Sequence, residues 1–364
     1  MTVFYHPRNE KVNRLRMIMS ILSSILSKTV SHGENICYNI CVKQMPEVLM
    51  PETLYQKIAQ IAPDRTIKNA PMSACTTFRI GGSADVLFSP KSESEIISAI
   101  ETAKSLGAPY IVIGQGSNLL VSGEGIEGLV VRLEKPFSSV EMHDGCICAQ
   151  AGATMISLAR FALEQGLAGL EFAHGIPGSV GGGVYMNAGA YGGEISQVLK
   201  SARCLMPDGR IIELSLEDMR LSYRKSRLMD EGGTVLSAKF ALSSGDKDEI
   251  KEKMDDFARR RREKQPLQMP SAGSTFKRPE GYFAGGLIEK AGLKGYSVGG
   301  AAVSDMHAGF LVNKSGASCA DMLLLISHVR KAVHDISGVW LEPEVRIIGR
   351  GLEGGIDDFD KMKS

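Results

Sequence analysis

The feature that most constrains the fold of this chain is a glycine-rich segment near its middle. Eight of the twenty residues from Gly175 to Glu194 are glycine. Glycine loses more backbone entropy on folding than any other residue, and a flexible linker of this density would be polar. Here Ile176, Val180 and Val184 stand between the glycines. The pattern predicts backbone wrapped closely around a flat or phosphorylated ligand, with a flexible loop as the alternative.

A second glycine motif, Gly114–Asn118, follows a strand expected at Tyr110–Ile113. Its two glycines permit a tight turn, and Ser117 and Asn118 add side-chain donors. Backbone N–H groups in such a turn can form a concave anion site. The motif is not a Rossmann dinucleotide fingerprint, because the third glycine and the following helix are missing. On this motif alone, an ordinary turn explains the residues equally well.

Composition narrows the classes of function. The chain has 42 Lys and Arg against 41 Asp and Glu, a net charge of +1, so no global field attracts nucleic acid or an anionic membrane. An anionic substrate must therefore be held by local groups. The seven cysteines show neither zinc-ligand spacing nor a disulfide framework, and we expect no metal site and free thiols in a reducing cytoplasm. No uninterrupted apolar run of membrane-spanning length occurs, so no membrane span is expected.

The order of strand and helix signals predicts α+β domains. Hairpins between the elements, above all one around Pro207–Gly209, argue against a single doubly wound sheet. We expect a poorly ordered N-terminal extension over residues 1–50, a first domain over 51–245, a second over 246–350 and a tail over 351–364. The expected strands are Ala84–Phe88, Tyr110–Ile113, Leu129–Arg132, Ile147–Gln150, Ala202–Met206, Arg210–Leu214 and Val345–Ile348, and the expected helices cover residues 51–61, 92–106, 154–165, 246–264, 283–291 and 319–336.

A basic run, Arg259–Lys264, ends the helix expected over residues 246–264. It could be read as a nucleic-acid patch. However, Asp255 and Asp256 precede Arg259 and Arg260 by one helical turn, a spacing at which opposite charges pair on a helix surface. We therefore expect a solvated, ion-paired face and no nucleic-acid partner.

Three shorter motifs carry side chains suited to catalysis. Arg224 follows an aromatic residue, Ser274 follows a small Ala-Gly pair, and Glu344 and Arg346 stand at the start of the last strand. Each one alone is more often structural: a surface ion pair, a turn or a solvated acid. No GxSxG elbow occurs and no His or Asp is near Ser274 in sequence, which disfavours a serine hydrolase.

Together the motifs resemble the UDP-N-acetylenolpyruvoylglucosamine reductases, flavin enzymes of bacterial peptidoglycan synthesis. The resemblance spans about residues 50–350 and implies a fold of the vanillyl-alcohol-oxidase type. Two α+β subdomains within residues 51–245 would hold FAD, and a C-terminal α+β domain within 246–350 would bind the substrate. The resemblance rests on seven ordered motifs at residues 79–82, 113–121, 169–194, 222–226, 272–277, 308–313 and 341–346.

The resemblance also implies a reaction and roles for single residues. NADPH would reduce the enolpyruvyl ether of the UDP-sugar through FAD, giving UDP-N-acetylmuramate, with Arg224, Ser274 and Glu344 at the catalytic positions. Arg224 would stabilise the developing negative charge, Ser274 would donate a proton, and Glu344 would be protonated or hydrogen-bonded. FAD would contact Gly114, Gly116, Ser117, Asn118, Gly178, Ser179, Asn187, Gly189 and Ala190, and the UDP-sugar would contact Tyr223, Lys277, Lys294 and His307.

Two features distinguish this chain within the family. About fifty residues separate Arg224 from Ser274, so the tyrosine-bearing substrate loop of one branch is absent. His174 stands where relatives often have a small residue or Cys, and we expect it to pack behind the site. Two other functions stay open: a related flavin oxidase with another substrate, and a non-catalytic nucleotide-binding regulator. The sequence leaves the oligomeric state and a preference for NADPH over NADH open.

Overall fold

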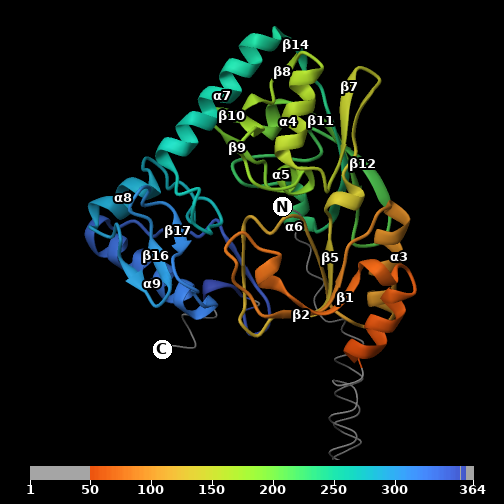
Figure 1. Ribbon diagram of the computed structural model, residues 1–364, viewed down its shortest axis with the longest axis horizontal. Helices are drawn as coiled ribbons and strands as arrows, with labels where there is room; N and C mark the ends of the chain where they lie inside the picture. Colours follow the sequence, from red (N-terminus) through yellow and green to blue (C-terminus); the bar gives the residue numbers. More distant parts are fainter. Residues whose placement is uncertain (1–49, 353, 358–364) are drawn as a thin grey trace, which may run out of the picture.

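The computed structural model describes residues 50–352 and 354–357, which form two sheets with their helices and a C-terminal domain (Figure 1). Of the extension expected over residues 1–50, residues 1–49 lie outside the described residues, as does most of the tail. Strands and helices are mixed in every part of the fold, which confirms the predicted α+β class.

The first sheet has four strands, with one antiparallel pair at its edge. In spatial order the strands are β1 (Thr66–Pro71), β2 (Ser83–Phe88), β5 (Ile126–Arg132) and β3 (Tyr110–Ile113). β1 is antiparallel to β2, and the other neighbours are parallel. Residues 50–59 are helical, and α3 (Glu93–Ser105) buries Ile96, Ala99, Ile100 and Ala103, one face of a helix.

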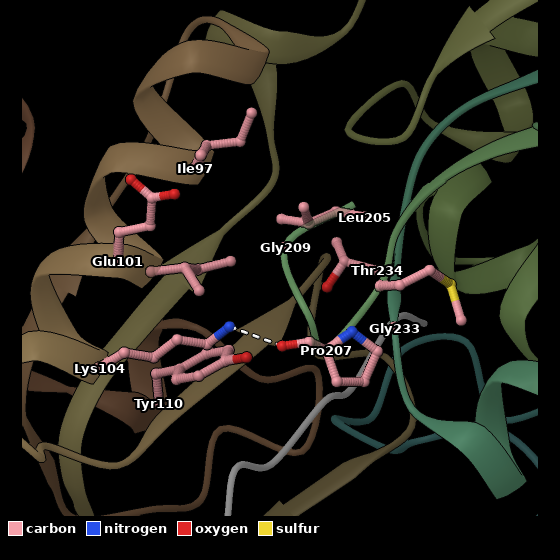
Figure 2. Close-up of a pocket in the computed structure, with 11 residues that line it drawn as sticks. Ile97, Glu101, Lys104, Tyr110, Leu205, Pro207, Gly209, Gly233 and Thr234 are labelled. Carbon is pink, nitrogen blue, oxygen red and sulfur yellow. Dashed lines mark hydrogen bonds between the residues drawn. The ribbon is translucent and has the colours of Figure 1, made fainter. Parts of the chain in front are cut away.

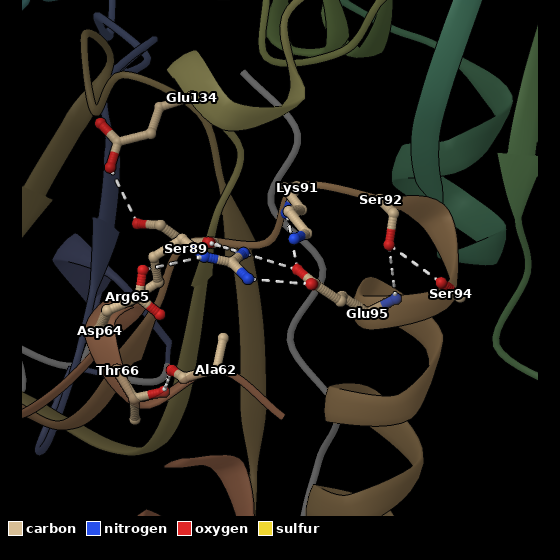
Figure 3. A network of polar contacts seen from close by, with 10 residues as sticks. All are labelled: Ala62, Asp64, Arg65, Thr66, Ser89, Lys91, Ser92, Ser94, Glu95 and Glu134. Carbon is tan, nitrogen blue, oxygen red and sulfur yellow. Dashed lines mark hydrogen bonds and ion pairs between the residues drawn. The ribbon is translucent and has the colours of Figure 1, made fainter. Parts of the chain in front are cut away.

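A largely buried ion pair fixes the start of α3 to the first sheet (Figure 3). Arg65 donates from both terminal nitrogens to Glu95, at 2.6 and 2.9 Å, and from Nη1 to the Ser89 carbonyl at 3.0 Å. The Arg65 hydrogen bonds hold the pKa of Glu95 below its ordinary value. Because the pair is bidentate and shielded, it restrains α3 more than a surface ion pair would.

The second sheet is antiparallel and has five strands. In spatial order they are β12 (Ile211–Ser215), β11 (Leu199–Leu205), β13 (Thr234–Phe240), β7 (Cys146–Gln150) and β6 (Val140–His143). β11 and β12 form the predicted hairpin, and Gly209 takes the positive φ of +88° that its turn requires. α4 (Met155–Glu164) begins at Thr154, whose side chain accepts the Ser157 N–H at 2.8 Å, as expected for a capping residue.

A lysine on α3 connects the first sheet's helix to the β11–β12 hairpin of the second sheet (Figure 2). Lys104, on α3, donates to the Pro207 carbonyl of the β11–β12 hairpin at 2.7 Å and lies 5.9 Å from the centroid of the Tyr110 ring. A narrow pocket lies here, and none of the residues predicted to bind cofactor or substrate lines it. We interpret this contact as a link between the subdomains.

The glycine-rich segment contains a short helix that its composition did not predict. α5 (Val180–Tyr185) includes three successive glycines and is buried over its whole length. Ser179 caps it by accepting the Gly182 N–H at 3.3 Å. Glycine is a poor helix former, so burial against the second sheet and this cap stabilise the helix. Shorter elements nearby are β8 (Leu167–Ala168) paired with β14 (Ser243–Ser244), β9 (Gly189–Ala190) paired with β10 (Gly193–Glu194), and α6 (Arg227–Glu231).

A long helix leads from the second sheet to the C-terminal domain (Figure 1). This helix, α7 (Lys247–Lys264), matches the helix predicted over residues 246–264, and the Asp246 side chain caps it by accepting the N–H groups of Asp248 and Glu249. Beyond it a small antiparallel sheet packs with two helices. Its strands are β15 (Ser297–Val298), β16 (Ala301–Val303) and β17 (Leu311–Asn313), and the helices are α8 (Ala284–Lys290) and α9 (Cys319–Ser337).

The last strand returns to the first part of the chain. β18 (Arg346–Ile348) pairs in parallel with β4 (Leu119–Val121), and Leu120 is buried in the core of the C-terminal domain. Because β4 directly follows the motif at residues 114–118, this pairing places that motif beside Glu344. The pairing therefore assembles the candidate site from residues more than two hundred positions apart.

Among the described residues, none of the helices combines the length and apolarity that a membrane crossing needs. In the same part of the chain, no three metal-ligating side chains cluster. The cysteines described there, Cys75, Cys146, Cys148, Cys204 and Cys319, are free thiols.

Candidate active site

Two glycine loops from the sequence motifs touch each other. The first cradle loop, residues 114–118, follows β3, and the second cradle loop, residues 175–179, precedes α5. Ser117 Oγ donates to the Pro177 carbonyl at 3.0 Å. A Cβ built on Gly178, whose φ is +135°, would lie 2.9 Å from Ser117 Oγ. Glycine at this position therefore meets both a backbone and a spatial requirement.

Gly114 shows how closely the loops approach. A Cβ built on it would lie 2.1 Å from Oγ and 3.0 Å from Cβ of Ser179. At Gly116, φ is +63°, and a Cβ would lie 2.0 Å from the Cys75 carbonyl oxygen. A side chain at Gly114 would collide with the Ser179 side chain, and one at Gly116 would collide with the Cys75 backbone. The glycines thus let two loops sixty residues apart form one surface.

That surface presents backbone donors without protein acceptors. Within the described residues, the N–H groups of residues 114–118, 178 and 179 have no hydrogen-bond partner, and all of these residues except Gln115 are buried. By contrast, Val180 and Gly181 donate to the carbonyls of Ala153 and Ala151. Buried N–H groups are nearly always paired in native proteins. The unpaired set therefore indicates a ligand rich in acceptor oxygens lying across both loops.

Arg224 is held rigidly in a tight turn. Ser222 and Lys225 exchange backbone hydrogen bonds at 3.1 Å, and Arg224 takes a φ of +55°, which is strained for a residue with a side chain. Its Nη1 donates to the Asn187 carbonyl at 3.3 Å and its Nη2 to the Gly189 carbonyl at 3.2 Å. Turn and carbonyls together fix the direction of the guanidinium.

Asn187 holds this turn through hydrogen bonds of its side-chain amide. It is fully buried and takes a φ of +47°. Its Nδ2 donates to the Ser222 carbonyl at 3.0 Å, and its Oδ1 accepts the Ser196 N–H at 2.9 Å. The amide is thus engaged with protein on both sides. Its structural role is to join the β9–β10 segment to the Arg224 turn.

Glu344 meets Arg224 from the C-terminal domain. Arg224 Nε donates to Glu344 Oε1 at 2.8 Å, and the two side chains are 20% and 12% exposed. Asn118 Nδ2 donates to the Glu344 carbonyl at 3.1 Å, so the first cradle loop also holds this residue. Hydrogen bonds therefore connect Asn118 to Glu344 and Glu344 to Arg224, three of the predicted site residues.

Ser274 lies on the neighbouring segment. Glu344 N donates to the Thr275 carbonyl at 2.8 Å, which sets the backbone of Ser274 beside that of Glu344. Thr275 is fully buried, whereas Ser274 is exposed, and Ser274 Oγ donates to the Phe276 carbonyl at 3.5 Å. The structure thus brings Arg224, Ser274 and Glu344 together from two domains.

The surroundings of Glu344 shift its pKa upward. Burial raises the pKa of Glu344, and the charge and hydrogen bond of Arg224 oppose this only in part. The result is a carboxyl group that keeps its proton at higher pH than an exposed glutamate does. Perturbed carboxyl groups of this kind occur often at active sites.

Each of the four predicted substrate residues makes a contact with another part of the protein. The Tyr223 ring lies 5.3 Å from the Arg224 guanidinium, and its hydroxyl accepts the Arg278 N–H at 3.1 Å. Lys277 forms an ion pair with Glu342, and Lys294 pairs with Glu289 at 3.0 Å. His307 Nδ1 accepts the Gly309 N–H at 3.1 Å, and burial lowers its pKa.

Arg261, in contrast, is a residue that the sequence interpretation missed. The predicted solvated face is present at Arg259 and Arg260, which pair with Asp256 at 2.5 and 2.7 Å. Arg261 instead is 8% exposed, its Nε has no partner, and no carboxylate pairs with it among the described residues. It lies against Gly175, where a Cβ would be 2.6 Å from its Cδ. A signal existed, because Arg261 continues the buried stripe of α7.

His174 lies close to the same cation. Its Nδ1 is buried without a partner, and burial, with Arg160 and Arg261, lowers its pKa. The neutral ring fits the expected packing role. Tyr191 covers Arg261 from the other side, with 5.4 Å between the guanidinium and the ring centroid. A buried guanidinium without a carboxylate partner is costly, so the position of Arg261 indicates an electron-rich ligand group nearby.

Comparisons with known proteins agree with this geometry. Residues 265–348 match the model of the UDP-N-acetylenolpyruvoylglucosamine reductase C-terminal domain, and residues 84–215 match an FAD binding domain. The UDP-N-acetylenolpyruvoylglucosamine reductase of Clostridium perfringens is 48% identical over 282 residues, which cover 78% of this chain and 92% of the relative. The chain belongs to the UDP-N-acetylenolpyruvoylglucosamine reductase family. The family member of Clostridium novyi is 50% identical over 299 residues, covering 82% and 97% of the two chains.

A solved structure supports the same family. The crystal structure of UDP-N-acetylenolpyruvylglucosamine reductase from Thermus caldophilus matches with a TM-score of 0.67 and 36% identity. It covers 78% of this chain and 97% of the other. The predicted family, the FAD cofactor and the oxidoreductase class are therefore confirmed.

The residues present fit FAD. Its diphosphate carries the acceptor oxygens that the unpaired N–H groups of both cradle loops require. Gly114 and Gly116 let the first cradle loop pack closely against Ser179 and the Cys75 backbone, which brings these N–H groups together. Arg261 adds a positive charge without a protein partner at the edge of the second cradle loop. These donors would hold the cofactor mainly by backbone and by one buried cation.

Proposed function

We propose that Arg224, Ser274 and Glu344 catalyse the reduction of the enolpyruvyl ether of UDP-N-acetylenolpyruvoylglucosamine to UDP-N-acetylmuramate. The 2.8 Å contact between Arg224 and Glu344 carries this proposal, because it joins the FAD domain to the C-terminal domain beside the first cradle loop. Bound FAD supplies a hydride that comes from NADPH. All other steps fall to side chains of this chain.

Arg224 stabilises the charge that forms on the substrate. When the methylene carbon gains the hydride, negative charge develops on the ether-bearing carbon and spreads into the carboxylate. A guanidinium stays charged at all relevant pH values and can meet this charge at once. The carbonyls of Asn187 and Gly189 hold its terminal nitrogens in place. The group therefore needs little reorganisation during the reaction.

Glu344 must be neutral for the substrate carboxylate to bind beside it. An ionised Glu344 would repel that carboxylate and compete for Arg224. The raised pKa of Glu344 supports the neutral state. In the free protein Arg224 contacts Glu344, and we propose that the substrate carboxylate takes over part of this contact.

Ser274 completes the reaction by donating a proton to the ether-bearing carbon. Ser274 is an exposed residue on the segment beside Glu344, and its hydroxyl makes a long contact of 3.5 Å to the Phe276 carbonyl. A hydroxyl is a weak acid, so its proton must be restored. The protonated carboxyl of Glu344 is suited to resupply it. The balance is one hydride from NADPH and one proton from Ser274, added across the carbon–carbon double bond.

The test compares Ser274→Ala with the wild-type holoenzyme in the two half-reactions. NADPH should bleach the flavin of both proteins equally. Anaerobic reoxidation by UDP-N-acetylenolpyruvoylglucosamine should be about 10²- to 10⁴-fold slower in S274A, the range for loss of a general acid. Equal reoxidation rates would remove Ser274 from the proposal. Reoxidation by oxygen but not by the sugar would favour a flavin oxidase.

We also propose that the protein acts in the cytoplasm. The free thiols of Cys75, Cys146, Cys148, Cys204 and Cys319 support a reducing compartment. Cell fractionation with an antibody against the native chain tests this location, and recovery in the periplasmic fraction would contradict it.

A further inference from the structure

Three exposed aromatic residues belong to segments next to the candidate site. Phe283 is 67% exposed, Tyr223 52% and Tyr282 49%. Single exposed aromatics are common, but an exposed aromatic next to an unpaired guanidinium near a candidate site suggests a binding surface. The chemistry proposed above leaves Phe283 and Tyr282 without a role.

Phe283 is connected to the Arg224 side of the site. The Tyr223 hydroxyl accepts the Arg278 N–H at 3.1 Å, and Tyr223 is next to Arg224 in sequence. The Arg278 guanidinium lies 4.6 Å from the centroid of the Phe283 ring. No carboxylate pairs with Arg278 in the part of the chain that the structure describes. The ring and a free guanidinium therefore stand together at the rim.

Phe283 is also connected to the Ser274 side. It is the capping residue of α8, and the second residue of that helix, Gly285, packs on His307. A Cβ built on Gly285 would lie 3.3 Å from His307 Cε1, and one built on Gly309 would lie 3.4 Å from Ser274 Oγ. Phe283 thus lies at the rim where the two sides of the site meet.

We propose that Phe283, backed by Arg278, is the stacking platform for the uracil base of the UDP-sugar. A flat base stacks on an aromatic face, and a neighbouring guanidinium adds a partner for phosphate. The platform accounts for base recognition in a chain that lacks the tyrosine-bearing loop. The inference rests on the proposed function, since it concerns the nucleotide part of the same substrate.

The test is calorimetric titration of the oxidised holoenzyme with UDP and, separately, with inorganic pyrophosphate. Phe283→Ala should weaken UDP binding about tenfold or more, the range for loss of one stacked base, and leave pyrophosphate binding within about twofold. Phe283→Trp should keep UDP binding near wild type. Arg278→Gln should weaken both ligands, because it removes charge and not the stacking face.

Trp340→Ala is the matched control. Trp340 is 57% exposed and also has a guanidinium over its ring, at 5.6 Å, but it stacks on His334 of α9. W340A should bind UDP as the wild type does. Unchanged UDP binding in F283A, an equal loss of UDP and pyrophosphate, or the same loss in W340A would each overturn the proposal, as would wild-type protein that does not bind UDP.

Titration with UDP needs no turnover, so this result is independent of the catalytic proposal. If F283A loses UDP binding while the wild type fails to reduce the enolpyruvyl sugar, the platform stands and the proposed reaction falls. If the wild type reduces the sugar and F283A binds UDP normally, the reaction stands and the platform falls. FAD absorbance and melting temperature of each variant confirm that it is folded.

Discussion

The contact between the two cradle loops leads to a rescue experiment. Gly114→Ala places a Cβ 2.1 Å from Oγ and 3.0 Å from Cβ of Ser179, whereas ordinary contacts begin near 3.4 Å. The Ser179 hydroxyl must therefore leave its capping position, and the loops must separate by a few tenths of an ångström. Overpacking of this kind costs about 1–3 kcal/mol of stability. It also moves the N–H groups of residues 114–118 away from those of 178 and 179. We expect FAD affinity to fall at least about tenfold, the equivalent of about 1.4 kcal/mol.

Ser179→Gly should restore much of this loss in the double variant. It removes the Oγ and Cβ atoms that the methyl group introduced at position 114 would meet. Alone it should cost only a few tenths of a kcal/mol, since glycine is tolerated at a helix cap. The coupling energy between the two substitutions should therefore be about 1–3 kcal/mol in the direction of rescue.

The four proteins to compare are the wild type, G114A, S179G and the double variant. Flavin fluorescence quenching on titration of each apoprotein with FAD gives its affinity, and urea unfolding gives its stability. Additive effects, with the double variant as weak as the sum of the single ones, would refute the inference that Gly114 is needed for loop contact. Wild-type affinity in G114A would refute it more directly.

Three further predictions concern single residues. Asn187→Ala should lower the free energy of unfolding by about 1–3 kcal/mol, because it removes the side-chain partners of the Ser222 carbonyl and the Ser196 N–H and places alanine at a φ of +47°. Urea unfolding that finds no loss of stability would contradict this. Arg261→Met should stabilise the apoprotein but weaken FAD binding, so urea unfolding and FAD titration should change in opposite directions. A loss of stability in the apoprotein would show that the cation has a protein partner. For Glu344, whose pKa is raised, kcat/KM for the sugar should fall as pH rises through that pKa, and Glu344→Gln should abolish this limb; a limb that persists in E344Q belongs to another group. The same raised pKa means that the stability contribution of Glu344 is present below the ordinary carboxyl pKa and is lost as pH rises through the raised one.

Much of the fold follows from local sequence signals. The β11–β12 hairpin and α4 are predictable because a turn glycine and a capping threonine act over four residues, within reach of sequence interpretation. α5 is not, because Gly181, Gly182 and Gly183 have low helix propensity and only burial in the fold stabilises them. Its helical state depends on tertiary contacts that no local pattern records.

The candidate site divides in the same way. The residue types of Arg224, Ser274 and Glu344 are identifiable through the family motifs, but their contact depends on the β4–β18 pairing, whose register no periodicity gives. Arg261 has a local signal, since it lies four residues after Phe257 on the buried stripe of α7. Its position in a run of arginines conceals it, because such runs usually form solvated faces.

The central claim is tested most directly by one anaerobic experiment on the purified holoenzyme. The protein is bleached with one equivalent of NADPH and then mixed with UDP-N-acetylenolpyruvoylglucosamine in D₂O. Return of the oxidised flavin spectrum, with UDP-N-acetylmuramate that carries deuterium at the ether-bearing carbon, is the predicted result. Bleached protein that stays reduced in the presence of the sugar would contradict the account.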